Sequence, residues 1–192
     1  MIKIITLLFI LANFGIAQIG VKSSYKMAHE TQTLDQAFLG NGVVDLIVKD
    51  SVIWAATGFG LNKSINAGAS WQSFTSNDYM AKGGISAMAY MGDSVFWIAS
   101  AFDTTAQDED LPAGGGLSYT KDGGIIWTHV AQPLDAREDT TISPTTTVVQ
   151  NLTFDITAVD STIWIASFGG GLRRSDDMGQ SWRVVTTDNK PF

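Results

Sequence analysis

The stretch Thr120-Lys121-Asp122-Gly123-Gly124-Ile125-Ile126-Trp127 recurs in two further versions and decides the fold. The other versions run from Ser64 to Trp71 and from Ser175 to Trp182, and all three reduce to S/T-x-D/N-x-G-x-x-W. The closing tryptophans fall at positions 71, 127 and 182, which is a nearly constant spacing. A motif that recurs at such a period indicates a repeat architecture built from one supersecondary unit.

Each motif closes a longer unit that has the pattern of short β-strands. Asp-Ser turns begin at Asp50, Asp93 and Asp160. An apolar stretch precedes each turn, a run of β-branched and aromatic residues follows it, and a glycine-rich connection ending in leucine comes next. Such residues favour half-buried strands and tight turns, so we expect four short antiparallel strands per unit. The units span about 43–74, 85–130 and 154–185.

Repeated four-stranded antiparallel units are the pattern of β-propeller blades, so the sequence predicts an all-β chain. No stretch after the N-terminal leader shows a sustained helical period with caps. Propellers close a ring of about 4 to 8 blades, whereas three units are present here. We expect an incomplete propeller, the N-terminal part of a longer one whose remaining blades lie beyond Phe192. A partial propeller that closes by association is the alternative.

The motif resembles the Asp-box, or bacterial neuraminidase repeat, of sialidases, xyloglucanase-type glycoside hydrolases, sortilin-like receptors and many secreted propellers. The resemblance covers the chain from about Val43 onward, and it departs from the pattern at Asn66, which replaces the aspartate. It implies a propeller fold, whereas activity differs among these families. The positions that match the box are Ser64, Asn66, Gly68, Trp71, Thr120, Asp122, Gly124, Trp127, Ser175, Asp177, Gly179 and Trp182.

The motif residues have a structural role that needs no ligand. A carboxylate or amide oxygen accepts backbone N–H groups across the turn between the last two strands, and Asn66 offers such an oxygen. The glycine suits a position of positive φ, and the tryptophan is a large apolar wedge beside the sheet. One acidic residue per turn falls short of the oxygen ligands that calcium prefers, so we expect no metal at the motifs.

The N-terminus has the pattern of a signal peptide over residues 1–17. Lys3 is followed by the apolar run Ile4 to Ala12 and by small residues ahead of Ala17. An uncleaved membrane anchor is the alternative, although the run is short for a spanning helix. The sequence contains no cysteine, which excludes a lipobox, a disulfide or a thiolate metal site. We expect a secreted, periplasmic or cell-surface location.

The chain is acidic, with 19 Asp and Glu residues against 12 Lys and Arg and a net charge of −7. This balance argues against nucleic acid as a partner, and against an anionic membrane surface once the signal is cleaved. No cofactor is indicated, because the glycine triplets starting at Gly114 and Gly169 lack the lysine and helix of a phosphate-binding loop. Residues 18–42 form a lead-in that could supply one strand to a neighbouring unit.

Two insertions interrupt the repeat and are candidate ligand-binding elements, because scaffolds place their chemistry on loops. Phe102 to Ala113 joins a second strand to a third, and Ala131 to Asn151 joins two units. Both are expected on the face opposite the motifs, where a glycan or a protein ligand would bind. The candidate ligand-binding residues are Asp103, Asp108, Glu109, Asp110, Asp135 and Arg137. Two alternatives stay open: solvated loops without a ligand, or calcium binding by the acidic side chains despite their unusual spacing.

We assign no catalytic residue from the sequence. Sialidases of this resemblance hold the substrate carboxylate with three arginines, the first ahead of the first box, whereas the first arginine here is Arg137. Asp45 and Asp155 occupy equivalent first-strand positions and are candidates for paired-carboxylate hydrolysis, but a repeated structural residue is the simpler interpretation. The prediction is an exported, non-catalytic module for binding or assembly. A glycoside hydrolase of the sialidase or xyloglucanase type and the sensor region of a longer signalling protein are the alternatives.

Overall fold

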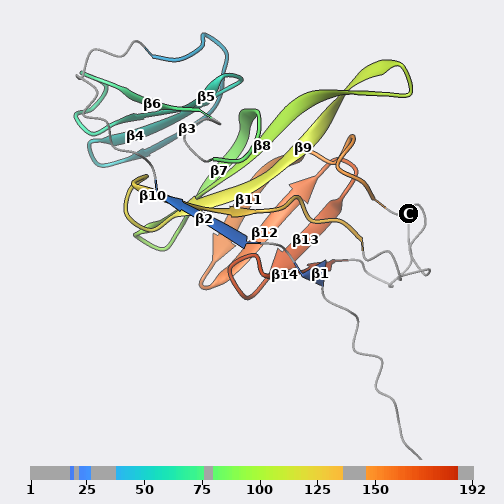
Figure 1. Cartoon of the computed structure of the whole chain (residues 1–192). Helices are drawn as coiled ribbons and strands as arrows, with labels where there is room; N and C mark the ends of the chain where they lie inside the picture. Colours follow the sequence, from blue (N-terminus) through green and yellow to red (C-terminus); the bar gives the residue numbers. More distant parts are fainter. Residues whose placement is uncertain (1–17, 20–21, 27–37, 76–79, 136–145, 186–192) are drawn as a thin grey trace, which may run out of the picture.

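The computed structural model describes residues 18–19, 22–26, 38–75, 80–135 and 146–185. These residues form strands and turns without any helix, in three antiparallel sheets (Figure 1). The described part therefore holds no helical segment that could cross a lipid bilayer. The expected signal peptide, 1–17, lies outside the described residues. The fold is all-β, as the sequence predicts.

Each sheet is a meander in which strands that follow one another in the chain pair side by side. The first sheet contains β3 (Val43–Lys49), β4 (Val52–Thr57), β5 (Gly60–Ser64) and β6 (Gln72–Phe74). The second contains β7 (Gly84–Met91), β8 (Val95–Ala106), β9 (Glu109–Thr120) and β10 (Ile126–Val130). The third contains β11 (Thr153–Val159), β12 (Thr162–Ser167), β13 (Gly171–Ser175) and β14 (Ser181–Val184).

Two short strands from the lead-in lengthen the outer edges of the second and third sheets. β1 (Gln18–Ile19) pairs antiparallel with β14, and β2 (Lys22–Lys26) pairs antiparallel with β10. The lead-in thus supplies two strands where the sequence predicted one. Their pairing satisfies backbone groups that an edge strand would otherwise leave open.

The three sheets pack in chain order, and two clusters of buried side chains hold them together. Trp54 and Trp127 belong to the cluster between the first and second sheets, in which Trp54 also stacks on Phe96 with ring centroids 4.4 Å apart. Trp97 and Trp182 belong to the cluster between the second and third sheets. The first strand β7 contacts both β3 and β11, so the three first strands lie side by side.

The three motifs form the turns between the third and fourth strands. In the second sheet, Thr120 Oγ1 donates to Asp122 Oδ1 at 2.7 Å and accepts from Gly124 N at 2.9 Å. Asp122 Oδ1 also accepts from the backbone N of Ile126 at 2.9 Å. The other two turns repeat these bonds, with Asn66 Oδ1 as the acceptor in the first. The motif glycine has a positive φ in all three turns.

The insertion Phe102 to Ala113 is a regular hairpin arm rather than a loop, because β8 and β9 continue through it (Figure 1). Strand pairing extends to Ala106 and Glu109, and a two-residue turn of Gln107 and Asp108 closes the arm. Both turn residues have positive φ, 56° and 63°, as a type I′ hairpin turn requires. The acidic residues and the proline of this segment are typical of a loop. The backbone hydrogen bonds between β8 and β9 nevertheless continue through it, so both strands stay extended.

Candidate functional site

The hairpin arm meets the connection between the second and third sheets at the end of the molecule opposite the motif turns. Gly114 N donates to Val148 O at 2.8 Å, and Gln150 N donates to Pro112 O at 2.7 Å. These backbone bonds join the two insertions of the sequence into one surface. We call this surface, with the neighbouring turns β4–β5 and β12–β13, the insertion end.

Glycines allow the connection to approach the sheets closely at the insertion end. A Cβ on Gly114 would lie 2.1 Å from the carbonyl oxygen of Asn151, and one on Gly170 would lie 2.4 Å from Asn151 Oδ1. Asn151 is buried, its Nδ2 donates to Pro133 O at 3.0 Å, and its Oδ1 accepts from Gln132 Nε2 at 3.1 Å. These glycines therefore serve backbone packing.

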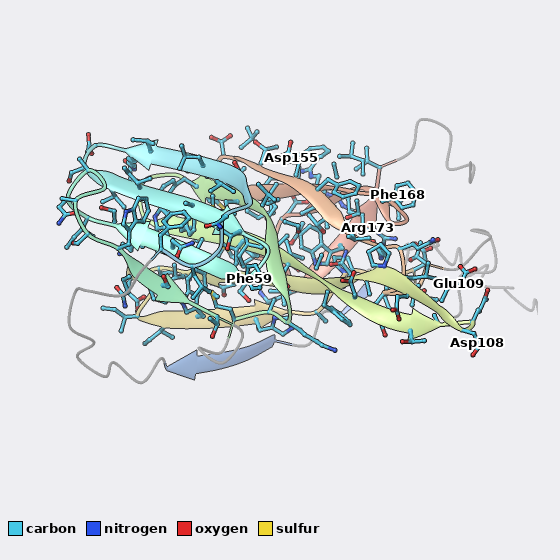
Figure 2. All side chains as sticks on the ribbon, turned by 90° about the horizontal axis from the view of Figure 1, so that it is seen from above. Phe59, Asp108, Glu109, Asp155, Phe168 and Arg173 are labelled. Atoms are coloured by element: carbon cyan, nitrogen blue, oxygen red, sulfur yellow. The ribbon has the colours of Figure 1, made fainter. Side chains whose placement is uncertain are left out.

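The four acidic candidates of the arm are exposed and do not converge. Asp103 and Thr105 lie on one face of β8, and Asp110 stands opposite Thr105, whose hydroxyl donates to Asp110 Oδ1 at 2.9 Å. Glu109 lies on the other face by strand alternation, and Asp108 lies in the turn. Figure 2 places Asp108 and Glu109 at the tip of the arm. Across the described ranges, no three Asp, Glu or His side chains are grouped so that they could hold a metal ion.

Asp135 and Arg173 form a buried ion pair. Arg173 Nη2 donates to Asp135 Oδ1 at 2.7 Å, and both side chains are only 3% exposed. Asp135 Oδ2 accepts from the backbone N of Thr146 at 3.0 Å, and Arg173 Nε donates to Gly170 O at 2.9 Å. Both carboxylate oxygens of this candidate ligand-binding residue are thus used inside the protein, where they tie the connection to β13. Arg137, the last candidate, lies outside the described residues.

Exposed phenylalanines mark the insertion end, and the sequence reasoning did not single them out. Phe59 lies in the β4–β5 turn and Phe168 in the β12–β13 turn, and they are 72% and 68% exposed. Phe154 is also exposed, and its ring centroid lies 6.3 Å from that of Phe168. Exposed rings of this kind can stack on the apolar face of a sugar or on a partner's side chain. In the sequence, Phe59 and Phe168 stand beside turn glycines, where the turn itself requires no aromatic side chain. That placement was the signal from which these two exposed residues could have been found.

Asp45 and Asp155 occupy equivalent bulges in β3 and β11. Asp45 Oδ1 accepts from Leu46 N at 2.8 Å, and Oδ2 accepts from Met88 N of β7 at 3.0 Å. This carboxylate therefore joins the first strands of two neighbouring sheets, which is a structural role. Asp155 is exposed.

Comparison with known proteins adds no identity to this picture. No protein-family model matches the chain, and a search of curated proteins found no match.

Proposed function

We propose that the three sheets are consecutive blades of an incomplete β-propeller of the Asp-box type, which acts as an exported, non-catalytic module for binding or assembly. Further sheets of the same kind are its structural partners, and a glycan or a protein is the ligand of its insertion end. Contacts between the sheets support the first part of the proposal, and exposed side chains support the second.

The contact between the first and second sheets is repeated between the second and third. A Cβ on Gly124 would lie 3.3 Å from the ring of Trp54, whose centroid is 6.5 Å from that of Trp127. A Cβ on Gly179 would lie at the same distance, 3.3 Å, from the ring of Trp97. In each case the second-strand tryptophan of one sheet packs against the motif of the next sheet. Such a contact can be repeated from sheet to sheet until a ring closes.

The third sheet presents the equivalent face without a cover, and this observation carries the proposal. Leu172 is 43% exposed, whereas its counterparts Leu61 and Leu117 in the first two sheets are 0% exposed. Trp164 and Ala166 are likewise more exposed than their buried counterparts. We call Trp164, Ala166 and Leu172 the open face of the third sheet. Its composition fits the motif side of another sheet.

The first sheet is covered on its outer strands but open on its inner strand. Phe38 of the lead-in packs edge-on against Trp71 with ring centroids 4.9 Å apart, and β3 exposes Val44, Leu46 and Val48 on one face. The first and third sheets therefore both carry exposed apolar surface. Contacts with further sheets would remove this surface from water, which favours assembly.

Ligand binding is proposed for the insertion end because the two insertions, the exposed phenylalanines and the acidic arm gather there. Phe154 and Phe168 offer an apolar platform, and exposed carboxylates such as Asp155 and Asp103 accept hydrogen bonds from hydroxyl or amide groups. This combination suits a neutral glycan or a polar protein loop better than an anion.

Light scattering over a range of protein concentrations tests the assembly part. We expect concentration-dependent association that Leu172→Glu reduces, because a charge on the open face opposes its burial. Phe168→Glu changes an apolar side chain at the insertion end and serves as the matched control, with association unchanged. A monodisperse monomer at all concentrations, or equal effects of the two variants, would contradict the proposal.

A further inference from the structure

A lysine of the first sheet holds the motif turn of the second. Lys63, the residue directly before the first motif, lies over the ring of Trp54, with Nζ 4.8 Å from the ring centroid. Its Nζ donates at 2.5 Å to the carbonyl oxygen of Gly123, the residue directly before the motif glycine of the second sheet. A long cation of one sheet is thus paired with a motif position of the next sheet that has no side chain.

The interface between the second and third sheets has an apolar pair at the same two positions. Tyr119 stands at the position of Lys63, and Met178 stands at the position of Gly123. Tyr119 packs on Trp97 with ring centroids 4.5 Å apart, and Met178 packs against the cluster that contains both rings. The two interfaces therefore use matched pairs, a cation with a small residue in one and an aromatic ring with methionine in the other.

The third sheet has the cation of such a pair on its open face. Arg174 stands at the position of Lys63, and its Cζ lies 5.3 Å from the ring centroid of Trp164. Arg174 Nε donates to Asp176 Oδ1 at 2.9 Å, and the guanidinium carries further N–H groups for another acceptor. Within the described ranges, no sheet follows the third, so no motif turn meets this cation.

The first sheet has the matching motif, and that motif is uncovered. Ala67 stands at the position of Gly123, and it is small and exposed. Among the described residues, a Cβ on the motif glycine Gly68 would meet only Ile53 and Trp71 of its own sheet within 4 Å. The motif glycines of the other two sheets instead lie against a tryptophan of the preceding sheet.

The inner strand of the first sheet is uncovered as well. Leu46 stands opposite Ala55 in the β3–β4 pair, as Met88 stands opposite Ile98 in the β7–β8 pair. Met88 is only 4% exposed in the cluster between the first two sheets, whereas Leu46 is 57% exposed. The first sheet thus lacks a preceding sheet at both its first strand and its motif.

The charges around the two cations are also compatible with this match. In the first interface, the Asp122 carboxylate of the next motif attracts the Lys63 ammonium. In the third sheet, Asp176 supplies the carboxylate to Arg174 from within the same sheet. The first motif has the neutral Asn66 at the position of Asp122. Each cation would therefore have one carboxylate.

We infer that the open face of the third sheet docks on the motif side of the first sheet in a second copy of this chain. Arg174 of one copy donates to the carbonyl oxygen of Ala67 in the other, and Trp164 covers the glycine of the same motif. The contact runs head to tail, so two copies with three sheets each complete a ring of about six sheets. The inference rests on the proposed assembly function and names its partner.

A double-mutant cycle on the full chain, with the dimer dissociation constant measured by analytical ultracentrifugation, tests the inference. Ala67→Met copies Met178, and Arg174→Tyr copies Tyr119. Each change alone is expected to weaken the dimer by at least about tenfold, because the hydrogen bond to the guanidinium is lost. The double variant recreates the pair of the second interface and is expected to recover most of the affinity. Ala67 has a φ of 53° and Met178 a φ of 60°, so methionine suits this backbone conformation.

The second sheet lies between the first and the third, so a coupling between residues 67 and 174 must arise between copies (Figure 1). Lys82→Gln is the control, because it removes a cation that lies over the ring of Phe102, and it is expected to leave the affinity unchanged. Thermal melts establish that all variants fold.

The outcomes separate this inference from the proposed function. Unchanged association in both folded single variants, or additive losses in the double variant, would overturn the inference. If Leu172→Glu still reduced association in that case, the proposed assembly would stand with a different partner surface. A wild-type chain that remains monomeric at all concentrations would overturn both.

Discussion

Replacing Arg173 by methionine should strongly destabilise the chain, because it leaves the Asp135 carboxylate buried without its cation. The pair has an N–O distance of 2.7 Å, and both side chains are 3% exposed. Removing one partner of such a buried pair typically costs about 3 to 5 kcal/mol. The native state of a typical domain is more stable than its unfolded state by only about 5 to 15 kcal/mol. The variant would therefore lose a large share of its stability.

Urea unfolding monitored by tryptophan fluorescence measures this loss as a shift of the midpoint. Arg174→Met is the matched control, because Arg174 is the next residue and the side chains of its ion pair with Asp176 are 37% and 42% exposed. Water screens an exposed pair, so we expect a much smaller shift in the control. Adding Asp135→Leu to Arg173→Met should recover part of the loss, since the unpaired charge is then gone. Equal midpoints for the two single variants would refute the reasoning.

Two further predictions concern the motif turns. Burial raises the pKa of the Asp122 carboxyl, but hydrogen bonds from Ile126, Thr120 and Ile125 outweigh this effect and hold the pKa below its ordinary value. The ionised carboxylate therefore stabilises the folded chain. This contribution is present above the pKa of the unfolded chain and is lost as pH falls through the lower pKa of the folded chain. Melting of Asp122→Asn, which copies Asn66, should therefore depend less on pH between about pH 5 and pH 2, and equal slopes in both proteins would count against this. Gly179→Ala should lower the melting temperature more than Gly92→Ala. Both glycines have positive φ, but a Cβ on Gly179 would lie 3.3 Å from the Trp97 ring, while one on Gly92 would meet nothing within 4 Å. Equal losses in the two variants would mean that backbone strain alone acts.

The repeat made the sheets predictable from sequence. Runs such as Val52 to Thr57 became strands, and the Asp-Ser turn after Lys49 became the β3–β4 turn, because the apolar pattern and the turn chemistry agree there. The acceptor role of Asn66 was also predictable, since an amide oxygen can replace a carboxylate oxygen in the same turn. Local chemistry determines each of these features.

The less predictable features depend on contacts between distant segments. Asp135 lies 38 positions before Arg173, and their pairing follows from how the connection packs on β13. The composition of Phe102 to Ala113 predicts a loop, because it does not reveal that the backbone of this segment pairs.

Thiol reactivity of Leu172→Cys measures whether a further sheet covers the open face of the third sheet, because the chain has no cysteine of its own. Leu117→Cys, at the equivalent buried position, is the protected reference. In the dilute chain we expect the thiol at 172 to react rapidly with a disulfide reagent and the thiol at 117 to be protected. When the chain is extended by another copy of residues 131–185, we expect the thiol at 172 to become protected too. An unchanged, rapid reaction in the extended and folded chain would contradict this expectation.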